Sequence, residues 1–143
     1  MRQNMSGWSQ AECDELKKAG IADEILYYHS ALGKEEKYTA HVFIAQYASP
    51  EQLKQNWERL NDNIALLYQS NVDSLLERSN FYLCFFLPKS MNTIEKEKIE
   101  NDAYCAKKYI FVSEKELSVE EKIQRVNEKI FELTYLESQD TSE

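Results

Sequence analysis

Acids and lysines within residues 95–102 are the side chains with the clearest capacity for catalysis. The cluster consists of Glu95, Glu97, Lys98 and Asp102. Metal-dependent nucleases use carboxylates and a lysine to hold a cation and to polarise water. That chemistry needs acids on neighbouring strands, whereas Glu95 begins a predicted helix, where glutamate favours the helix dipole. A charged helix face is therefore the favoured interpretation, and a small metal-dependent nuclease stays an alternative function.

Other residue types that are typical of catalytic and cofactor sites are few and scattered. Neither His29 nor His41 has cysteine, histidine or carboxylate side chains at the spacing of metal ligands. A cysteine–histidine nucleophile pair stays open, although no local motif marks one. Phosphate-binding loops need clustered glycines, and the glycines of this chain stand alone at Gly7, Gly20 and Gly33. We therefore predict no catalytic residues, no metal and no cofactor.

The cysteines favour a cytoplasmic protein with reduced thiols. Cys13, Cys84 and Cys105 are odd in number and have no Cys-x-x-Cys spacing, whereas disulfide frameworks belong to oxidising compartments. Residues 1–4 lead into no apolar segment of the kind found in signal peptides. The longest apolar run is far shorter than the ~20 residues that span a membrane. We expect no association with a membrane.

The composition indicates a globular domain with long regular elements. The sequence has 143 residues, of which 43% are hydrophobic, and this is enough for one core. Its 3 glycines and 2 prolines are too few for turn-rich sandwiches and barrels. The net charge of -8 argues against a broad nucleic-acid surface, which needs clustered lysine and arginine. It suits a soluble protein, or one that meets a basic partner.

The hydrophobic pattern predicts a strand–helix–strand unit in the second half of the chain. The apolar run 81–87 shows no alternation, which suits a strand buried on both faces of an α/β sheet. A polar, helix-prone stretch over 92–108 follows it, and residues 109–112 form a second apolar run. Strands joined by helical crossovers of this length predict parallel pairing.

Asp102 needs a partner in this arrangement. On the predicted helix it shares a face with Ala103 and Ala106, whose small side chains let another element approach closely. A carboxylate that is partly buried on such a face requires a hydrogen-bonding or basic partner. Lys98 lies one turn back and can supply it, and a residue of another subunit is the alternative.

A strand and a long helix are predicted before this unit. Residues 38–47 are rich in β-formers with polar flanks, which is typical of a strand. Ser49 and Pro50 form a strong helix start. A single apolar stripe then continues through residues 50–78. It consists of Leu53, Trp57, Leu60, Ile64, Leu67, Asn71 and Leu75.

Further helices are predicted at both ends of the chain. Apolar residues recur at helical spacing within 9–33, and residues 118–136 combine a capping box with a clean apolar stripe. Residues 1–8 and 138–143 are polar and are predicted to be disordered.

The predicted fold is a single α/β domain over residues 1–143, with its core at 38–136. A small, mostly parallel three-stranded sheet is covered by the long helix and by the N- and C-terminal helices.

Three short motifs resemble a known bacterial family. They are Asn80-Phe81-Tyr82 at a strand start, Ile99-Glu100-Asn101-Asp102, and the basic pair that enters the last strand in Lys107-Lys108-Tyr109-Ile110. Together they resemble the small middle component of ABC-three-component bacterial conflict systems, which include Lamassu-type antiphage defence. The upstream strand and the long helix with Trp57 also fit, so that the resemblance covers residues 38–135.

The resemblance implies a non-enzymatic adaptor. Such proteins are encoded beside an SMC-like or RecN-like ABC ATPase and an effector, often a nuclease, and join the two. It implies contact with nucleic acid only through these partners. The family-motif residues are Glu100, Asp102, Lys107 and Lys108. The chain departs from the family pattern at Ser79, where tryptophan is expected, and at the two lysines, where arginine is common and pairs differently.

Apolar residues beside the main helix stripes predict a protein interface. They are Leu66, Tyr68, Leu76, Phe131 and Tyr135. Exposed apolar patches mark interaction sites, and aromatic residues dominate their binding energy. The alternative is that the N-terminal helices cover these residues within the same chain. An unrelated protein-binding module is a further alternative function.

Overall fold

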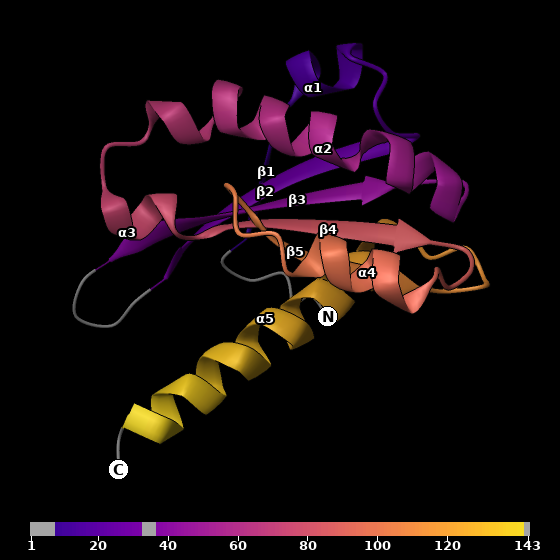
Figure 1. The fold of residues 1–143 in the computed structure, drawn as a ribbon. Helices are drawn as coiled ribbons and strands as arrows, with labels where there is room; N and C mark the ends of the chain where they lie inside the picture. The colour runs from indigo at the N-terminus through magenta and orange to yellow at the C-terminus, as the bar shows by residue number, and fades with distance from the viewer. Residues whose placement is uncertain (1–7, 33–36, 142–143) are drawn as a thin grey trace. The chain divides into compact units, whose positions relative to one another are not determined.

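The computed structural model describes residues 8–32 and 37–141, with side chains described as far as residue 130 (Figure 1). The chain divides into two compact units. One comprises residues 8–115, and the other contains the C-terminal helix. Of the ends predicted to be disordered, residues 1–7 and 142–143 lie outside the described part of the chain.

The larger unit is built on a mixed five-stranded sheet in which the strands follow one another in sequence order. The first three strands pair antiparallel, and the last three pair parallel. They are β1 (Ser9–Ala11), β2 (Glu24–Leu32), β3 (Tyr38–Gln46), β4 (Phe81–Leu87) and β5 (Lys107–Val112). The predicted parallel strands are therefore present, but the prediction of only three strands is wrong.

The error lies in the N-terminal segment, which was predicted as helices over 9–33. Only the short helix α1 (Asp14–Lys18) forms there, and Gly20, at φ +65, follows its end. Strand β2 pairs along its whole length with β3. Its residues Ile25 and Tyr27 belong to one core cluster while Leu26 and Tyr28 are also buried. A strand that is buried at successive positions does not show the alternation of apolar and polar residues that identifies a half-buried strand. Its apolar residues can therefore also be read at the spacing of a helix.

Strand β4 lies inside the sheet between β3 and β5, and all seven of its residues are buried. This confirms the prediction for the unbroken apolar run. Alternate residues Phe81, Leu83 and Phe85 belong to the core cluster on one face of the sheet.

Helix α2 (Pro50–Leu67) lies across that face (Figure 1). Its N-cap Ser49 accepts a hydrogen bond from the backbone N–H of Gln52 at 3.1 Å, as the sequence predicts. The predicted stripe packs into the core through Trp57, Leu60 and Ile64, which are at most 5% exposed.

The predicted helix over 50–78 is wrong beyond Leu67. Tyr68 leaves the helical conformation, a 3-10 turn η2 (Gln69–Asn71) follows, and Val72 is extended. A separate short helix, α3 (Leu75–Arg78), then begins, because Ser74 accepts a hydrogen bond from the N–H of Glu77 at 3.2 Å. Local side-chain capping therefore competes successfully with continuation of the helix.

Helix α4 (Thr93–Glu100) is also shorter than the predicted 92–108. Asn92 caps its start, as the sequence indicates. The chain then turns, and Cys105 takes a left-handed conformation with φ 64 before β5 begins. This positive φ is incompatible with a helix that continues to the strand.

Helix α5 (Val119–Thr141) forms the described part of the second unit and confirms the predicted C-terminal helix. Its start is a reciprocal capping box. Ser118 Oγ accepts from the N–H of Glu121 at 3.1 Å, and Glu121 Oε1 accepts from the N–H of Ser118 at 2.8 Å. Across the described ranges, none of the helices has the length and apolarity that a membrane crossing requires.

Candidate functional site

The turn between α4 and β5 is built around the ammonium group of Lys108, whose side chain is fully buried. Nζ donates to Asp102 Oδ1 at 2.6 Å, to the Tyr104 carbonyl at 2.6 Å and to the Asp102 carbonyl at 3.1 Å. The three donors of a lysine are therefore all used. A charge this deeply buried requires such compensation.

Asp102 thus finds its basic partner in Lys108, and the prediction of Lys98 is wrong. The expected pairing assumed a helix through residue 108, but α4 ends at Glu100. Asp102 instead begins a turn, in which its Oδ1 also accepts from the N–H of Tyr104 at 3.0 Å. The alternative of a partner on another subunit is not needed to compensate this carboxylate.

Hydrogen bonds also join this turn to the C-terminal half of α2 and to η2. Asn61 Nδ2 donates to the Tyr104 carbonyl at 2.9 Å. Gln69 Nε2 donates to the Arg78 carbonyl at 2.9 Å and approaches the Cys105 carbonyl at 3.5 Å. Side-chain amides therefore connect the turn, η2 and α3 into one region.

Glu100 supports the edge strand β5. Its Oε2 accepts from the backbone N–H of Ile110 at 2.9 Å, while Oε1 lies 3.7 Å from Lys96 Nζ. An outward-facing N–H of an edge strand is otherwise open to pairing with another chain. The fourth motif residue, Lys107, holds its Nζ 5.4 Å from the ring centroid of Tyr82.

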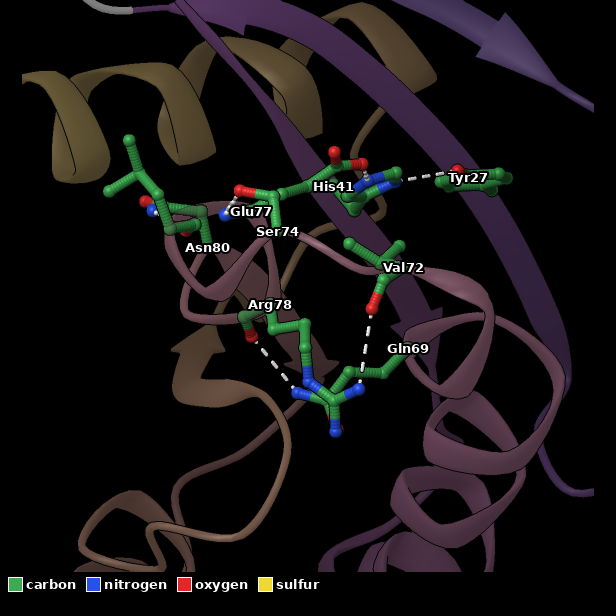
Figure 2. A network of polar contacts seen from close by, with 9 residues as sticks. Tyr27, His41, Gln69, Val72, Ser74, Glu77, Arg78 and Asn80 are labelled. Carbon is green, nitrogen blue, oxygen red and sulfur yellow. Dashed lines mark hydrogen bonds and ion pairs between the residues drawn. The ribbon is translucent and has the colours of Figure 1, made fainter. Parts of the chain in front are cut away.

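A second polar cluster joins α3 to the sheet (Figure 2). Tyr27 Oη lies 2.7 Å from His41 Nδ1, and His41 Nε2 lies 2.7 Å from Glu77 Oε2. A neutral imidazole that carries its proton on Nε2 satisfies both contacts, because Nδ1 then accepts from the tyrosine hydroxyl. The histidine ring also stacks on Phe81, with centroids 4.3 Å apart.

Burial sets the protonation states of this cluster. It lowers the pKa of His41, and this effect outweighs the hydrogen bond and charge of Glu77, which act in the opposite direction. Burial raises the pKa of Tyr27 to about 12, with further contributions from Tyr68 and Glu77. Both groups are therefore neutral near pH 7. His41 lies in the segment 38–47 that was predicted as a strand, but no spacing in the sequence indicates its two partners.

A pocket of about 580 Å³ opens between α3 and the α4–β5 turn. Its lining includes Leu75 and Arg78 from α3, and Glu100, Asp102 and Lys108 from the turn region. Lys107 lines the pocket as well, so that the structure brings all four predicted family-motif positions to this pocket.

The residues predicted to form an interface differ in their surroundings. Leu66 is 71% exposed and Leu76 is 36% exposed. Tyr68 is partly buried, and its ring contacts those of Tyr27 and Phe43 edge-on at centroid distances of 5.1 Å each. Phe131 and Tyr135 belong to α5, but their side chains lie outside the described residues.

The residues of the alternative nuclease site are placed on a helix and a turn. Glu95, Glu97 and Lys98 lie on α4, where Glu95 is 3.8 Å from Lys54. Asp102 is engaged by Lys108. In the part of the chain with described side chains, no three histidine, cysteine or acidic residues are placed to bind a metal together.

The fold and the turn define a small α/β protein in which the family-motif residues organise one region around the start of β5. Residues 40–137 match the family described as ABC-three component (ABC-3C) system Middle Component 1, and the chain belongs to this family. The resemblance found from the three motifs is thereby confirmed. No curated protein and no solved structure matched the chain.

Proposed function

We propose that this chain is a non-enzymatic adaptor of a bacterial antiphage defence complex, joining an SMC-like or RecN-like ABC ATPase to an effector subunit. The observation that carries the proposal is the family match over residues 40–137, since a middle component works among other subunits. A Lamassu-type system with a nuclease effector is the specific form that we favour.

The geometry of the motif residues supports a role in shaping the protein. Glu100 accepts a backbone hydrogen bond from β5, and Asp102 pairs with the buried Lys108. Carboxylates that are committed in this way are poor candidates for binding a catalytic cation, which needs free oxygen ligands. The exposed Leu66 and Leu76 offer apolar surface to partners.

Co-expression with the products of the neighbouring genes tests the proposal. A tagged chain should recover both an ABC ATPase and an effector in one complex through size-exclusion chromatography. Recovery of neither subunit would refute the adaptor role.

The alternative of a nuclease is tested with the purified chain alone. We expect no cleavage of DNA with added magnesium or manganese. Cleavage that disappears in a folded Asp102→Asn variant, with the fold checked by circular dichroism, would favour the enzyme instead.

A further inference from the structure

We propose that α3 and the pocket beside it bind an acidic segment of a partner subunit, through the side chain of Leu75 and the guanidinium of Arg78. The segment would place a carboxylate against Arg78 and an apolar residue against Leu75. This inference rests on the proposed adaptor function and assigns it a surface.

Leu75 is the first observation. At 79% exposure it is the most exposed large hydrophobic residue among those described, although it lies on a helix of only four residues. It also lines the 580 Å³ pocket. An exposed leucine at the rim of a cavity is well placed to be buried by a partner's apolar side chain.

The charge of the pocket is the second observation. Its lining contains three cationic residues and two acidic ones, in a chain whose net charge is -8. Both acids are already engaged, Glu100 by the N–H of Ile110 and Asp102 by Lys108. The lining therefore carries one more positive than negative charge, and neither of its carboxylates forms an ion pair with Arg78 or Lys107.

The guanidinium of Arg78 is the group that would donate hydrogen bonds to the partner's carboxylate (Figure 2). Nη1 donates to the Val72 carbonyl at 3.3 Å, and no carboxylate pairs with Arg78 among the residues with described side chains. A guanidinium has five N–H donors in a planar fork that fits a carboxylate. Donors thus remain for an acidic side chain from outside the chain.

Hydrogen bonds to β3 and a helix cap hold α3 in position, which favours specific binding. Glu77 is anchored to His41, Ser74 caps the helix, and the Asn80 carbonyl accepts from the N–H of His41 at 2.9 Å. Leu75 and Arg78 are therefore presented by a pre-organised element. Pre-organisation lowers the conformational cost of association.

An acidic protein segment fits this surface better than nucleic acid does. Phosphate backbones are bound by several clustered lysines and arginines. Here one arginine with free donors lies beside an exposed leucine, and a leucine gains nothing from a phosphate.

The test compares complexes formed by the full chain with its two co-expressed partner subunits. Leu75→Ser and Arg78→Glu should each weaken binding of one partner about tenfold or more, as measured by interferometry with that purified partner. Arg78→Lys should lose less affinity than Arg78→Glu but clearly more than the controls, because it keeps the charge and loses the planar fork of donors. Matched controls are Ile94→Ser, at a residue 76% exposed on α4, and Arg59→Glu, at an exposed arginine on α2.

The outcomes separate this inference from the proposed function. Wild-type chain that binds neither partner overturns both. Wild-type binding that survives Leu75→Ser and Arg78→Glu overturns only the site on α3, and so does an equal loss in the two controls. A DNA duplex that binds the wild-type chain and is lost in Arg78→Glu alone would replace the protein segment by nucleic acid. Melting curves verify that each variant is folded.

Discussion

Lys108 Nζ and Asp102 Oδ1 lie 2.6 Å apart, with the lysine side chain fully buried and the aspartate one-third exposed. The pair connects the first residues of the edge strand β5 to the turn that leaves α4. Because the ammonium also binds two carbonyls of that turn, one side chain fixes the backbone of residues 102–104. The two family-motif positions therefore form one structural unit.

Asp102→Ala should lower the free energy of unfolding by about 3 kcal/mol, because it leaves a buried ammonium with only carbonyl acceptors. Urea unfolding followed by circular dichroism measures this change. Asp102→Ala combined with Lys108→Met should cost less than the sum of the two single changes, since the double variant leaves no buried charge. Additive effects would contradict the coupling between the two side chains.

Glu100→Ala should open the outer edge of β5. The N–H of Ile110 loses its acceptor, and a lost hydrogen bond of this kind costs about 1–1.5 kcal/mol. Hydrogen exchange should show faster exchange of the Ile110 amide than in the wild-type protein. Lys96→Ala is the matched control, because Lys96 pairs with the same carboxylate at 3.7 Å on the exposed helix surface and contributes little. Unchanged protection of Ile110 in Glu100→Ala would show that the carboxylate is not its acceptor in solution.

His41 should titrate below pH 6.5, because burial lowers its pKa. Glu77→Gln should lower this pKa further, since the Glu77 carboxylate favours the protonated ring. NMR of the imidazole Hε1 proton measures both effects, and with 2 histidines in the chain, His29→Gln leaves a single signal to follow. A rise in the pKa on Glu77→Gln would contradict the contact between the two side chains.

The same shift makes the stability of the fold depend on pH. The unfolded chain binds a proton at His41 more readily than the folded chain, with a pKa of about 6.5. The free energy of unfolding that the buried neutral His41 contributes is therefore fully present above pH 6.5. It is lost as the pH falls from 6.5 toward the lower pKa of the folded state. Urea unfolding at pH 7.5 and at pH 5 measures this effect. The free energy of unfolding should fall less between the two pH values in His41→Gln than in the wild-type protein.

The parallel part of the sheet could be predicted because its pattern is unambiguous. The run 81–87 is apolar at every position, and its burial throughout β4 agrees. The start and the buried face of the long helix were equally clear, since Ser49 and Pro50 mark its start and Trp57, Leu60 and Ile64 mark its buried face, but its end at Leu67 was not predicted.

The missed elements depend on partners that lie far away in the sequence. Strand β2 is specified by its pairing with β3, and the same apolar residues also satisfy helical spacing. The end of α4 is set by Lys108, whose ammonium binds the Asp102 and Tyr104 carbonyls of the turn. The Tyr27–His41–Glu77 cluster joins three separate elements, and no local spacing records it. Local patterns therefore indicated where α2 and α4 start, whereas tertiary contacts decide that residues 24–32 form a strand and where α4 ends.

Tyr68 and Leu66 provide the sharpest test of which apolar residues at the end of α2 belong to the core. Tyr68→Asp should lower the free energy of unfolding by about 3 kcal/mol, because it places a carboxylate against the rings of Tyr27 and Phe43. Leu66→Asp should change it by no more than about 0.5 kcal/mol, since that side chain is 71% exposed. Urea unfolding of both variants measures the difference. Loss of partner binding in Leu66→Asp at unchanged stability would mark an interface there, whereas equal stability of the two variants would show that Tyr68 is not packed on the sheet.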